Sequence, residues 1–221
     1  MRQPSMSAVF DAATAAIKAL NELGYIACLC GSVACYIYGM DSRTPKDVDI
    51  IVLNATPSDC ESIKSSLVST DRHFLLVPAR DPRDTYKVLW HSTYQERCKV
   101  DILTPGILNI PQVPTDRLVL LKSHSNLPLL PFIPLLFLKV QAWSHHGSSD
   151  KIRLQFKQIQ DVLDIEDLVD IAVSYGDNKK DEEGWMPKEF VEIGTAFVTE
   201  YQLVNQDMRS VRRQKWAKIM D

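Results

Sequence analysis

The sequence predicts an α/β (α+β) fold in which a mixed sheet flanked by helices is followed by an all-helical C-terminal domain. Three observations lead to this prediction. Helical and strand-like segments alternate up to residue 103, the pattern beyond residue 127 is helical throughout, and the Ser- and Asn-containing segment 123–126 between them is typical of a linker. We therefore expect two domains, at residues 1–125 and 126–221.

Composition places the chain among ordinary globular proteins. Of its 221 residues, 45% are hydrophobic and 24% are charged, which excludes a disordered, collagenous or coiled-coil chain. The 25 Lys and Arg residues are balanced by 28 Asp and Glu residues, so the formal net charge is −3. No global positive field exists to hold a polyanion, and any contact with nucleic acid would have to be local.

No segment has the length and hydropathy of a membrane span. The most apolar run, residues 127–138, is interrupted by three prolines and is much shorter than the roughly 20 residues that a spanning helix needs. The N-terminus also lacks the order of basic, apolar and small residues that marks a signal peptide. We expect no membrane partner and a cytoplasmic location, with the nucleus as the alternative; the sequence does not specify an oligomeric state.

The predicted elements of the first part follow one another closely. Apolar positions at helical spacing predict a helix over residues 5–24 that stops at a glycine, and a short buried strand over 25–30 comes next. The further expected elements are a helical turn or two at 32–38, a β-branched strand at 48–53, a helix at 57–68, and strands at 73–77, 86–90 and 99–103.

The second part is expected to be helical. Periodicity predicts helices over residues 132–143 and 152–172, and a third apolar stripe formed by Phe190, Ile193, Phe197, Tyr201 and Val204. The charged segment 176–184 is expected to be a surface loop. A basic C-terminal helix contains Arg209, Arg212, Arg213, Lys215 and Lys218. This helix could contact RNA or a phosphate-rich acceptor, but simple solvation of its charges is the favoured interpretation.

The five cysteines are odd in number and include no CxxC or CxxH pair that would complete a tetrahedral site. A disulfide framework and a cysteine zinc site are therefore disfavoured. Because Cys28 and Cys30 fall in a strand that we expect to be buried, we interpret the cysteines as small hydrophobic residues of the core.

The segment Asp47-Val48-Asp49-Ile50-Ile51-Val52 carries two carboxylates on one predicted strand. Residues i and i+2 of a strand point the same way, so Asp47 and Asp49 project together, and a third carboxylate, Asp101, interrupts an otherwise apolar strand further on. If the two strands are neighbours, the three carboxylates converge. Hard oxygen ligands of this kind suit Mg²⁺, or Mn²⁺ in its place, and such a trio can hold two ions.

A small-residue turn at Gly31 and Ser32 precedes a short predicted helix. A glycine permits close backbone approach, and the start of a helix offers free N–H groups and a positive dipole end to a phosphate. The sequence therefore predicts a phosphate site beside the metal site.

These features together resemble the DNA polymerase β-like nucleotidyltransferase superfamily. The signature of that family is Gly-Gly or Gly-Ser, a short helix, Asp-x-Asp and an aspartate on a later strand. Its members most similar to this sequence are the small enzymes related to type IV abortive-infection toxins and to antibiotic nucleotidyltransferases. The residues that match are Gly31, Ser32, Ala34, Gly39, Arg43, Thr44, Asp47, Asp49 and Asp101, with a weaker match at Leu135, Leu138, Lys139, Ala142, Trp143, Lys157, Asp161 and Asp164. The resemblance spans roughly residues 10–172.

The resemblance implies a role for each matched site residue. Asp47 and Asp49 would bind both metal ions, and Asp101 would bind the catalytic ion and help to deprotonate the nucleophile. Gly31 and Ser32 would hold the β- and γ-phosphates of a nucleoside triphosphate, ATP among the candidates. The resemblance also places a triphosphate-binding lysine at Lys139, for which the competing interpretation is a lysine that only extends from an apolar helix to the surface.

The implied reaction transfers NMP from an NTP to an acceptor hydroxyl or phosphate and releases pyrophosphate, with nucleotide and acceptor meeting in the cleft between the domains. No motif identifies the acceptor as a small molecule, an RNA end or a protein. Two alternatives stay open: a catalytically idle module that binds nucleotide or a protein partner, and a tRNA-modifying toxin of the type IV kind.

Two further groups of polar residues have mainly structural interpretations. Asp161, Asp164, Asp167 and Asp170 recur at three-residue spacing, which is typical of a solvated helix face, although the resemblance gives Asp161 a chance of function. His145 and His146 at the end of a predicted helix are expected to be an exposed pair.

Overall fold

The structure, a computed structural model, describes residues 3–80, 83–205 and 210–221. The chain divides into two compact units. Unit 1 comprises Met1–Ile37, Thr44–Ile110 and Pro114–Leu130, and unit 2 comprises Tyr38–Arg43, Pro111–Val113 and Pro131–Asp221.

Unit 1 contains a five-stranded mixed sheet in the order β1-β2-β5-β4-β3. Its strands are β1 (Ala27–Cys30), β2 (Asp47–Val52), β3 (Phe74–Pro78), β4 (Lys87–Ser92) and β5 (Arg97–Leu103). β2 and β5 are parallel, and every other neighbouring pair is antiparallel. The strands predicted from the sequence are confirmed, and so is the mixed sheet.

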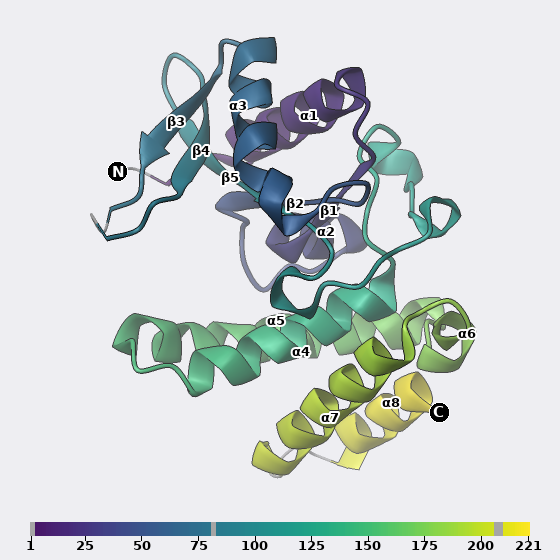
Figure 1. Ribbon diagram of the computed structural model, residues 1–221. Helices are drawn as coiled ribbons and strands as arrows, with labels where there is room; N and C mark the ends of the chain where they lie inside the picture. The colour runs from purple at the N-terminus through teal and green to yellow at the C-terminus, as the bar shows by residue number, and fades with distance from the viewer. Residues whose placement is uncertain (1–2, 81–82, 206–209) are drawn as a thin grey trace. The chain divides into compact units, whose positions relative to one another are not determined.

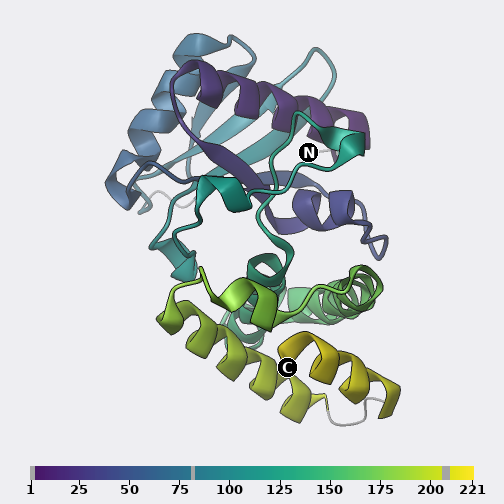
Figure 2. The same ribbon diagram turned by 90° about the vertical axis from the view of Figure 1, so that its right-hand side faces the viewer.

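Helices α1 (Met6–Glu22) and α3 (Cys60–Thr70) lie side by side and pack against the strands (Figures 1 and 2). α1 begins where the Ser5 hydroxyl accepts the Ala8 N–H, and its alanine-rich stripe is buried. α2 (Gly31–Tyr38) follows β1 directly. Short 3-10 turns occupy Pro57–Asp59, Ile107–Asn109, Thr115–Arg117 and Lys122–His124, the last of them within the predicted linker.

Alternation along β2 and β5 gives the sheet two different faces. Val48 and Ile50 of β2 and Val100 of β5 are fully buried, whereas the residues between them are only half-buried. We call the buried side the helix-covered face and the other side the carboxylate face, because the latter bears Asp47, Asp49 and Asp101.

The free edge of β1 is covered by a later segment of the same unit. The N–H of Leu29 donates to the carbonyl of Pro128 (2.7 Å), and the N–H of Leu130 donates to the carbonyl of Leu29 (2.9 Å). These two hydrogen bonds satisfy the N–H and C=O of Leu29 on the side of β1 that faces away from β2.

Four of the five cysteines are buried, as the sequence predicts, and Cys60 is half-buried. Burial raises the pKa of the Cys28 and Cys98 thiols to about 12, and the charges of Asp47 and Asp49 add to the effect at Cys98. These thiols are protonated and unreactive at neutral pH.

Unit 2 is helical, as predicted: α4 (Phe132–Gly147), α5 (Ile152–Tyr175), α6 (Lys179–Glu183), α7 (Lys188–Val204) and α8 (Ser210–Met220). The prediction of a loop throughout residues 176–184 is wrong, because α6 lies within it. Asn178 caps this short helix by accepting the N–H of Asp181 with its side chain (3.0 Å), which offsets the low hydrophobicity of the segment. Arg209 of the predicted basic helix lies outside the described residues.

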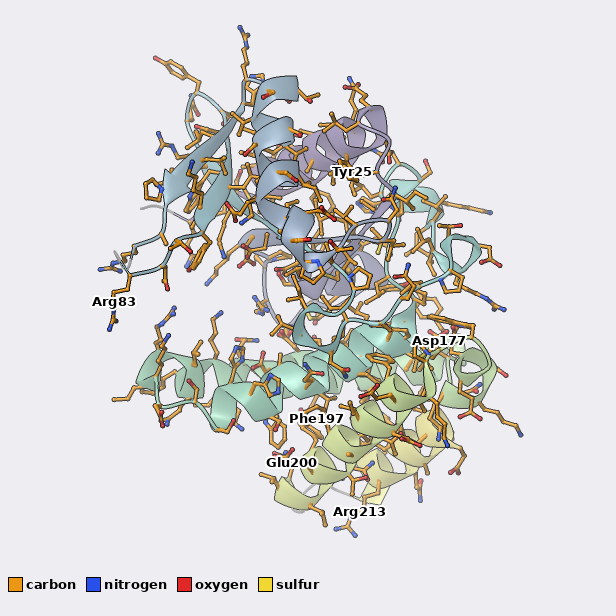
Figure 3. All side chains as sticks on the ribbon, in the orientation of Figure 1. Tyr25, Arg83, Asp177, Phe197, Glu200 and Arg213 are labelled. Atoms are coloured by element: carbon orange, nitrogen blue, oxygen red, sulfur yellow. The ribbon has the colours of Figure 1, made fainter. Side chains whose placement is uncertain are left out.

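α4 packs closely against α7 through a glycine. A β-carbon at Gly194 would lie 2.2 Å from the ring of Phe137, so the two helices approach more closely there than any side chain would allow. The Glu200 carboxylate accepts the Ser144 hydroxyl, and the Phe197 ring meets the His145 ring edge to face at 5.6 Å; Figure 3 labels both α7 residues.

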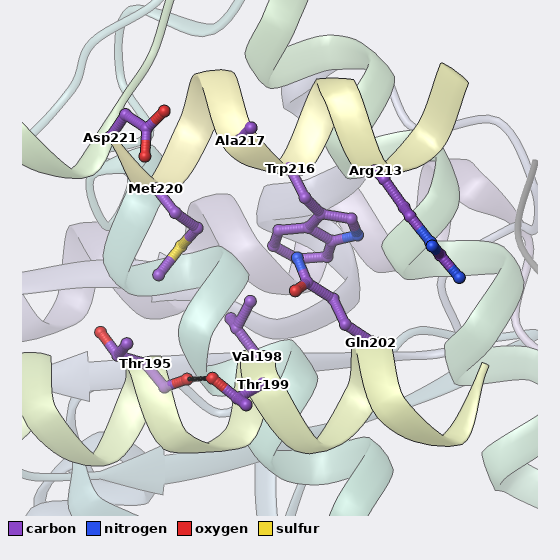
Figure 4. Close-up of a pocket in the computed structure, with 9 residues that line it drawn as sticks. All are labelled: Thr195, Val198, Thr199, Gln202, Arg213, Trp216, Ala217, Met220 and Asp221. Atoms are coloured by element: carbon purple, nitrogen blue, oxygen red, sulfur yellow. Dashed lines mark hydrogen bonds between the residues drawn. The ribbon is translucent and has the colours of Figure 1, made fainter. Parts of the chain in front are cut away.

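An open pocket of about 270 Å³ lies between α7 and α8 and is lined by Thr195, Val198, Thr199, Gln202, Arg213, Trp216, Ala217, Met220 and Asp221 (Figure 4). Among the described helices, none combines the length and apolar character that crossing a bilayer requires.

Candidate functional site

The register of the parallel pair β2 and β5 brings the predicted carboxylates onto one face. Asp49 lies opposite Asp101, and Asp47 lies opposite Lys99. Directly opposite residues of neighbouring strands point to the same side of a sheet, so Asp47, Asp49 and Asp101 all belong to the carboxylate face. The predicted adjacency of the two strands is therefore correct.

Lys99 is a member of this group that sequence analysis missed. Its ammonium lies 2.6 Å from Oδ2 of Asp101. Although partial burial favours the neutral amine, the charges of Asp101, Asp49 and Asp47 raise the pKa of Lys99 above its ordinary value. All three carboxylates thus act on one cation. The i, i+2 spacing of Lys99 and Asp101 was the signal that would have placed Lys99 on this face.

Gly31 permits the close approach of Asp49 to the turn after β1. The backbone of Gly31 is left-handed (φ +61°), and a β-carbon there would lie 1.9 Å from Oδ2 of Asp49. Only glycine meets both conditions. The glycine of the predicted turn therefore makes room for a site carboxylate.

Ser32, in the first turn of α2, has a buried hydroxyl without a described hydrogen-bond partner. The residue is 4% exposed, and its Oγ has no hydrogen-bond partner among the residues that the structure describes. A buried hydroxyl without a partner costs free energy, so its retention needs an explanation. A phosphate oxygen that accepts from Ser32 would supply the missing bond.

The donor set of this face suits a hard divalent cation, because it consists of carboxylate oxygens beside a turn that can receive phosphates. The carboxylates do not surround one point in this structure, however. Of the described residues, the one group of three whose ligand atoms all lie within 4.8 Å of one another is found elsewhere. A cation would have to take the place of the Lys99 ammonium against Asp101.

In unit 2, Lys139 is a buried partner of Asp164. Its ammonium lies 2.5 Å from Oδ2 of Asp164, and the guanidinium of Arg43 contacts the same carboxylate at 3.0 Å. Burial raises the pKa of Asp164, but Lys139 and Arg43 more than offset this and hold the pKa at about 2. The predicted contact of Lys139 with a triphosphate stays a prediction.

The interpretation of the acidic stripe on α5 as a solvated face is wrong for two of its residues. Asp161 is 5% exposed and Asp164 is fully buried, because both carboxylates face cations or donors of neighbouring segments. Asp161 receives a hydrogen bond from His146, which is therefore not part of an exposed pair, and Asp167 accepts the N–H of Ser42 at 2.8 Å. Asp170 remains on the surface, where Lys215 contacts it.

The fold defined by these elements is that of a nucleotidyltransferase-like protein. An antigenic nucleotidyltransferase-like protein from Paracoccidioides brasiliensis superposes with a TM-score of 0.67 at 12% identity, over 96% of this chain and 95% of that chain. The predicted fold, a mixed sheet flanked by helices and followed by C-terminal helices, is thereby confirmed.

Two further solved structures match less well. JHP933 from Helicobacter pylori has 16% identity and a TM-score of 0.45 over 97% of this chain and 88% of that chain. ANT(2″)-Ia in complex with adenylyl-2″-tobramycin has 11% identity and a TM-score of 0.46 over 89% and 99%. The fold assignment depends on the first match alone. No protein-family model matches the sequence, and no curated protein matches it significantly.

Proposed function

We propose that the protein is a divalent-metal-dependent nucleotidyltransferase that transfers NMP from an NTP to an acceptor hydroxyl or phosphate and releases pyrophosphate. The observation that carries the proposal is the register of β2 and β5, which sets Asp49 directly opposite Asp101 with Asp47 on the same face. A cluster of like charges on a rigid sheet has no structural benefit of its own, because its members repel one another.

Each residue of the carboxylate face has a role in this proposal. Asp47 and Asp49 hold Mg²⁺ or Mn²⁺, and Asp101 completes the ligand set and accepts the proton of the acceptor hydroxyl. Gly31 and Ser32 bind the β- and γ-phosphates through the backbone and the free Ser32 hydroxyl. The acceptor oxygen then bonds to the α-phosphorus while the bond to the β-phosphate oxygen breaks and pyrophosphate leaves. When bound, the divalent ions would activate the acceptor oxygen and neutralise charge on the phosphates.

The test incubates the protein with each labelled NTP, Mg²⁺ and a cell extract, and locates the label. We expect label on an acceptor with the wild type, and its loss with Asp47→Asn or Asp49→Asn, which relieve repulsion without metal and should not lower thermal stability. Asp116→Asn, which changes an exposed carboxylate of the same unit, is the matched control. Wild-type turnover by Asp49→Asn at saturating Mg²⁺ would exclude the carboxylate face as the site.

One observation favours a second candidate, a nucleotide-binding module without catalysis. Lys99 already neutralises Asp101 with its own ammonium, so the face can be stable without metal. The two candidates differ in how NTP binding depends on metal. In the catalytic proposal NTP binds weakly in EDTA, because the triphosphate then faces the carboxylates, and tightly with Mg²⁺; calorimetric titration that gives equal affinity in both conditions would favour the idle module.

The labelling experiment identifies the acceptor and the preferred NTP, and its design assumes no acceptor class. A small molecule, an RNA end and a protein would each carry the label into a separable fraction of the extract. Label on tRNA would favour the toxin-like alternative.

A further inference from the structure

Three potential metal ligands meet at the edge of the sheet formed by β3 and β4. Asp71, His73 and His91 each offer a ligand atom, and these atoms all lie within 4.8 Å of one another. Ligand atoms bound at about 2.1 Å to one tetrahedral zinc-class ion lie about 3.4 Å apart, so side-chain movements of about an ångström would bring this group to binding distance.

The backbone around the three residues is firmly hydrogen-bonded. Asp71 ends α3, where its N–H donates to the carbonyl of Leu67 at 3.0 Å. The carbonyl of His73 accepts the N–H of Ser92 at 2.8 Å, which ties it to the residue next to His91 in β4. Two of the ligands therefore come from the short hydrogen-bonded turn between α3 and β3 and the third from β4, and this backbone order favours a preorganised site.

The side chains of Asp71, His73 and His91 also lie close together. Nδ1 of His73 lies 2.7 Å from Oδ1 of Asp71, and the rings of His73 and His91 are 5.9 Å apart. His91 is 6% exposed, whereas the side chains of Asp71 and His73 are 30% and 47% exposed. One ligand is thus fixed in the core and two face solvent, which gives an ion a path of entry and leaves room for water.

We propose that Asp71, His73 and His91 form a binding site for a divalent transition metal of the zinc class. Two imidazoles and one carboxylate are the donor set that such ions take in proteins, and imidazole is a poor ligand for Mg²⁺. The ion would fasten the end of α3 to the sheet edge. Asp71, His73 and His91 include no thiol, so the lack of a cysteine site in the sequence does not argue against metal binding by these three residues.

This site is separate from the carboxylate face. His91 lies opposite Cys98 in the antiparallel register, and Cys98 alternates with Lys99 along β5. His91 therefore points to the helix-covered face, whereas Asp47, Asp49 and Asp101 belong to the other face. An experiment can therefore contradict the proposed metal site without contradicting the proposed nucleotidyl transfer, and the reverse.

The test measures thermal unfolding and calorimetric titration with ZnCl₂ in excess Mg²⁺, which would compete with Zn²⁺ for the carboxylate face. We expect Zn²⁺ to raise the Tm of the wild type in a concentration-dependent way, since a ligand that binds the folded state stabilises it. His73→Gln changes an exposed side chain and Asp71→Asn a half-buried one at the end of α3, and both variants should fold; each should lower Zn²⁺ affinity at least tenfold. His124→Gln, which removes a histidine elsewhere in unit 1, and Asp49→Asn should both retain the Tm shift.

Co²⁺ in place of Zn²⁺ identifies the donors by absorption. Bands of a site with nitrogen and oxygen ligands, lost in His73→Gln, would support the proposal. It would be overturned by the absence of a Zn²⁺-dependent Tm shift, by an equal shift in His73→Gln, or by thiolate-to-cobalt charge transfer, which would assign the binding to a cysteine such as the half-buried Cys60.

Discussion

At Gly31 the chain needs both a left-handed backbone and space for the carboxylate of Asp49. Gly24 has the first property alone: its φ is +81° and no atom lies within 4 Å of where a β-carbon would be. Comparing substitutions at Gly24 and Gly31 therefore separates the cost of backbone strain from the cost of displacing Asp49.

We expect Gly24→Ala to lower the free energy of unfolding by about 1 kcal/mol, through backbone strain only. Gly31→Ala should lower it by at least about 1 kcal/mol more, because its β-carbon overlaps Asp49, and it should also abolish Mg²⁺-dependent NTP binding. Urea unfolding and calorimetry measure the two effects. Equal destabilisation by the two variants would contradict the close approach.

Ser32 supports a prediction in which stability and binding respond differently. Because its buried hydroxyl has no described partner, Ser32→Ala should leave the Tm without ligand unchanged or slightly higher. If the hydroxyl donates to a phosphate, the same change removes a charge-assisted bond of about 1.5–3 kcal/mol and weakens NTP binding roughly tenfold to a hundredfold.

Thr104 is the matched control for Ser32, since its hydroxyl is likewise buried and without a described partner. Thr104→Val should raise or preserve the Tm and leave NTP affinity unchanged. If Ser32→Ala binds NTP within twofold of the wild type, Ser32 does not contact the phosphates.

The packing of α4 against α7 depends on one small residue, Gly194. The β-carbon of an alanine at position 194 would lie 2.2 Å from the Phe137 ring, so α7 would have to move away from α4. Overpacking of this kind costs about 1–3 kcal/mol, and we expect Gly194→Ala to lower the urea midpoint accordingly with an unchanged m-value.

Gly184→Ala is the control for this prediction, because Gly184 has φ −61° and no neighbour within 4 Å. Its effect should stay within about 0.5 kcal/mol. A Gly194→Ala variant as stable as Gly184→Ala would show that the helices can separate without cost.

At the scale of the whole molecule, local pattern predicted the elements of both parts, since alternation in β2 and periodicity in α4 and α5 report burial directly. The adjacency of β2 and β5 was predicted only conditionally, because strand order depends on contacts between residues far apart in the chain. The same limit explains which features the sequence did not predict. Lys99, the burial of Asp164 and the capping of α6 by Asn178 each depend on a partner that periodicity does not specify.

The cluster formed by Asp164, Lys139 and Arg43 makes acid stability depend on charges of unit 2. The pKa of Asp164 is about 2 in the folded protein, below its ordinary value of 3.8, so the unfolded chain binds the proton more readily. The stabilisation is therefore fully present above about pH 4 and is lost as the pH falls toward 2, and it amounts to about 2 kcal/mol.

Replacing one cation tests this linkage without removing the buried carboxylate. In Arg43→Gln the pKa of Asp164 should rise toward its ordinary value, because the carboxylate then keeps Lys139 but loses the charge and hydrogen bonds of Arg43. Urea unfolding followed from pH 5 to pH 2 should show a smaller loss of stability, which begins near pH 4 as in the wild type and levels off at higher pH than in the wild type. Arg153→Gln, which changes an exposed arginine of α5, should follow the wild-type curve. Superimposable pH profiles of Arg43→Gln and the wild type would mean that Arg43 does not hold down the pKa of Asp164, and the acid sensitivity would then have to come from other carboxylates.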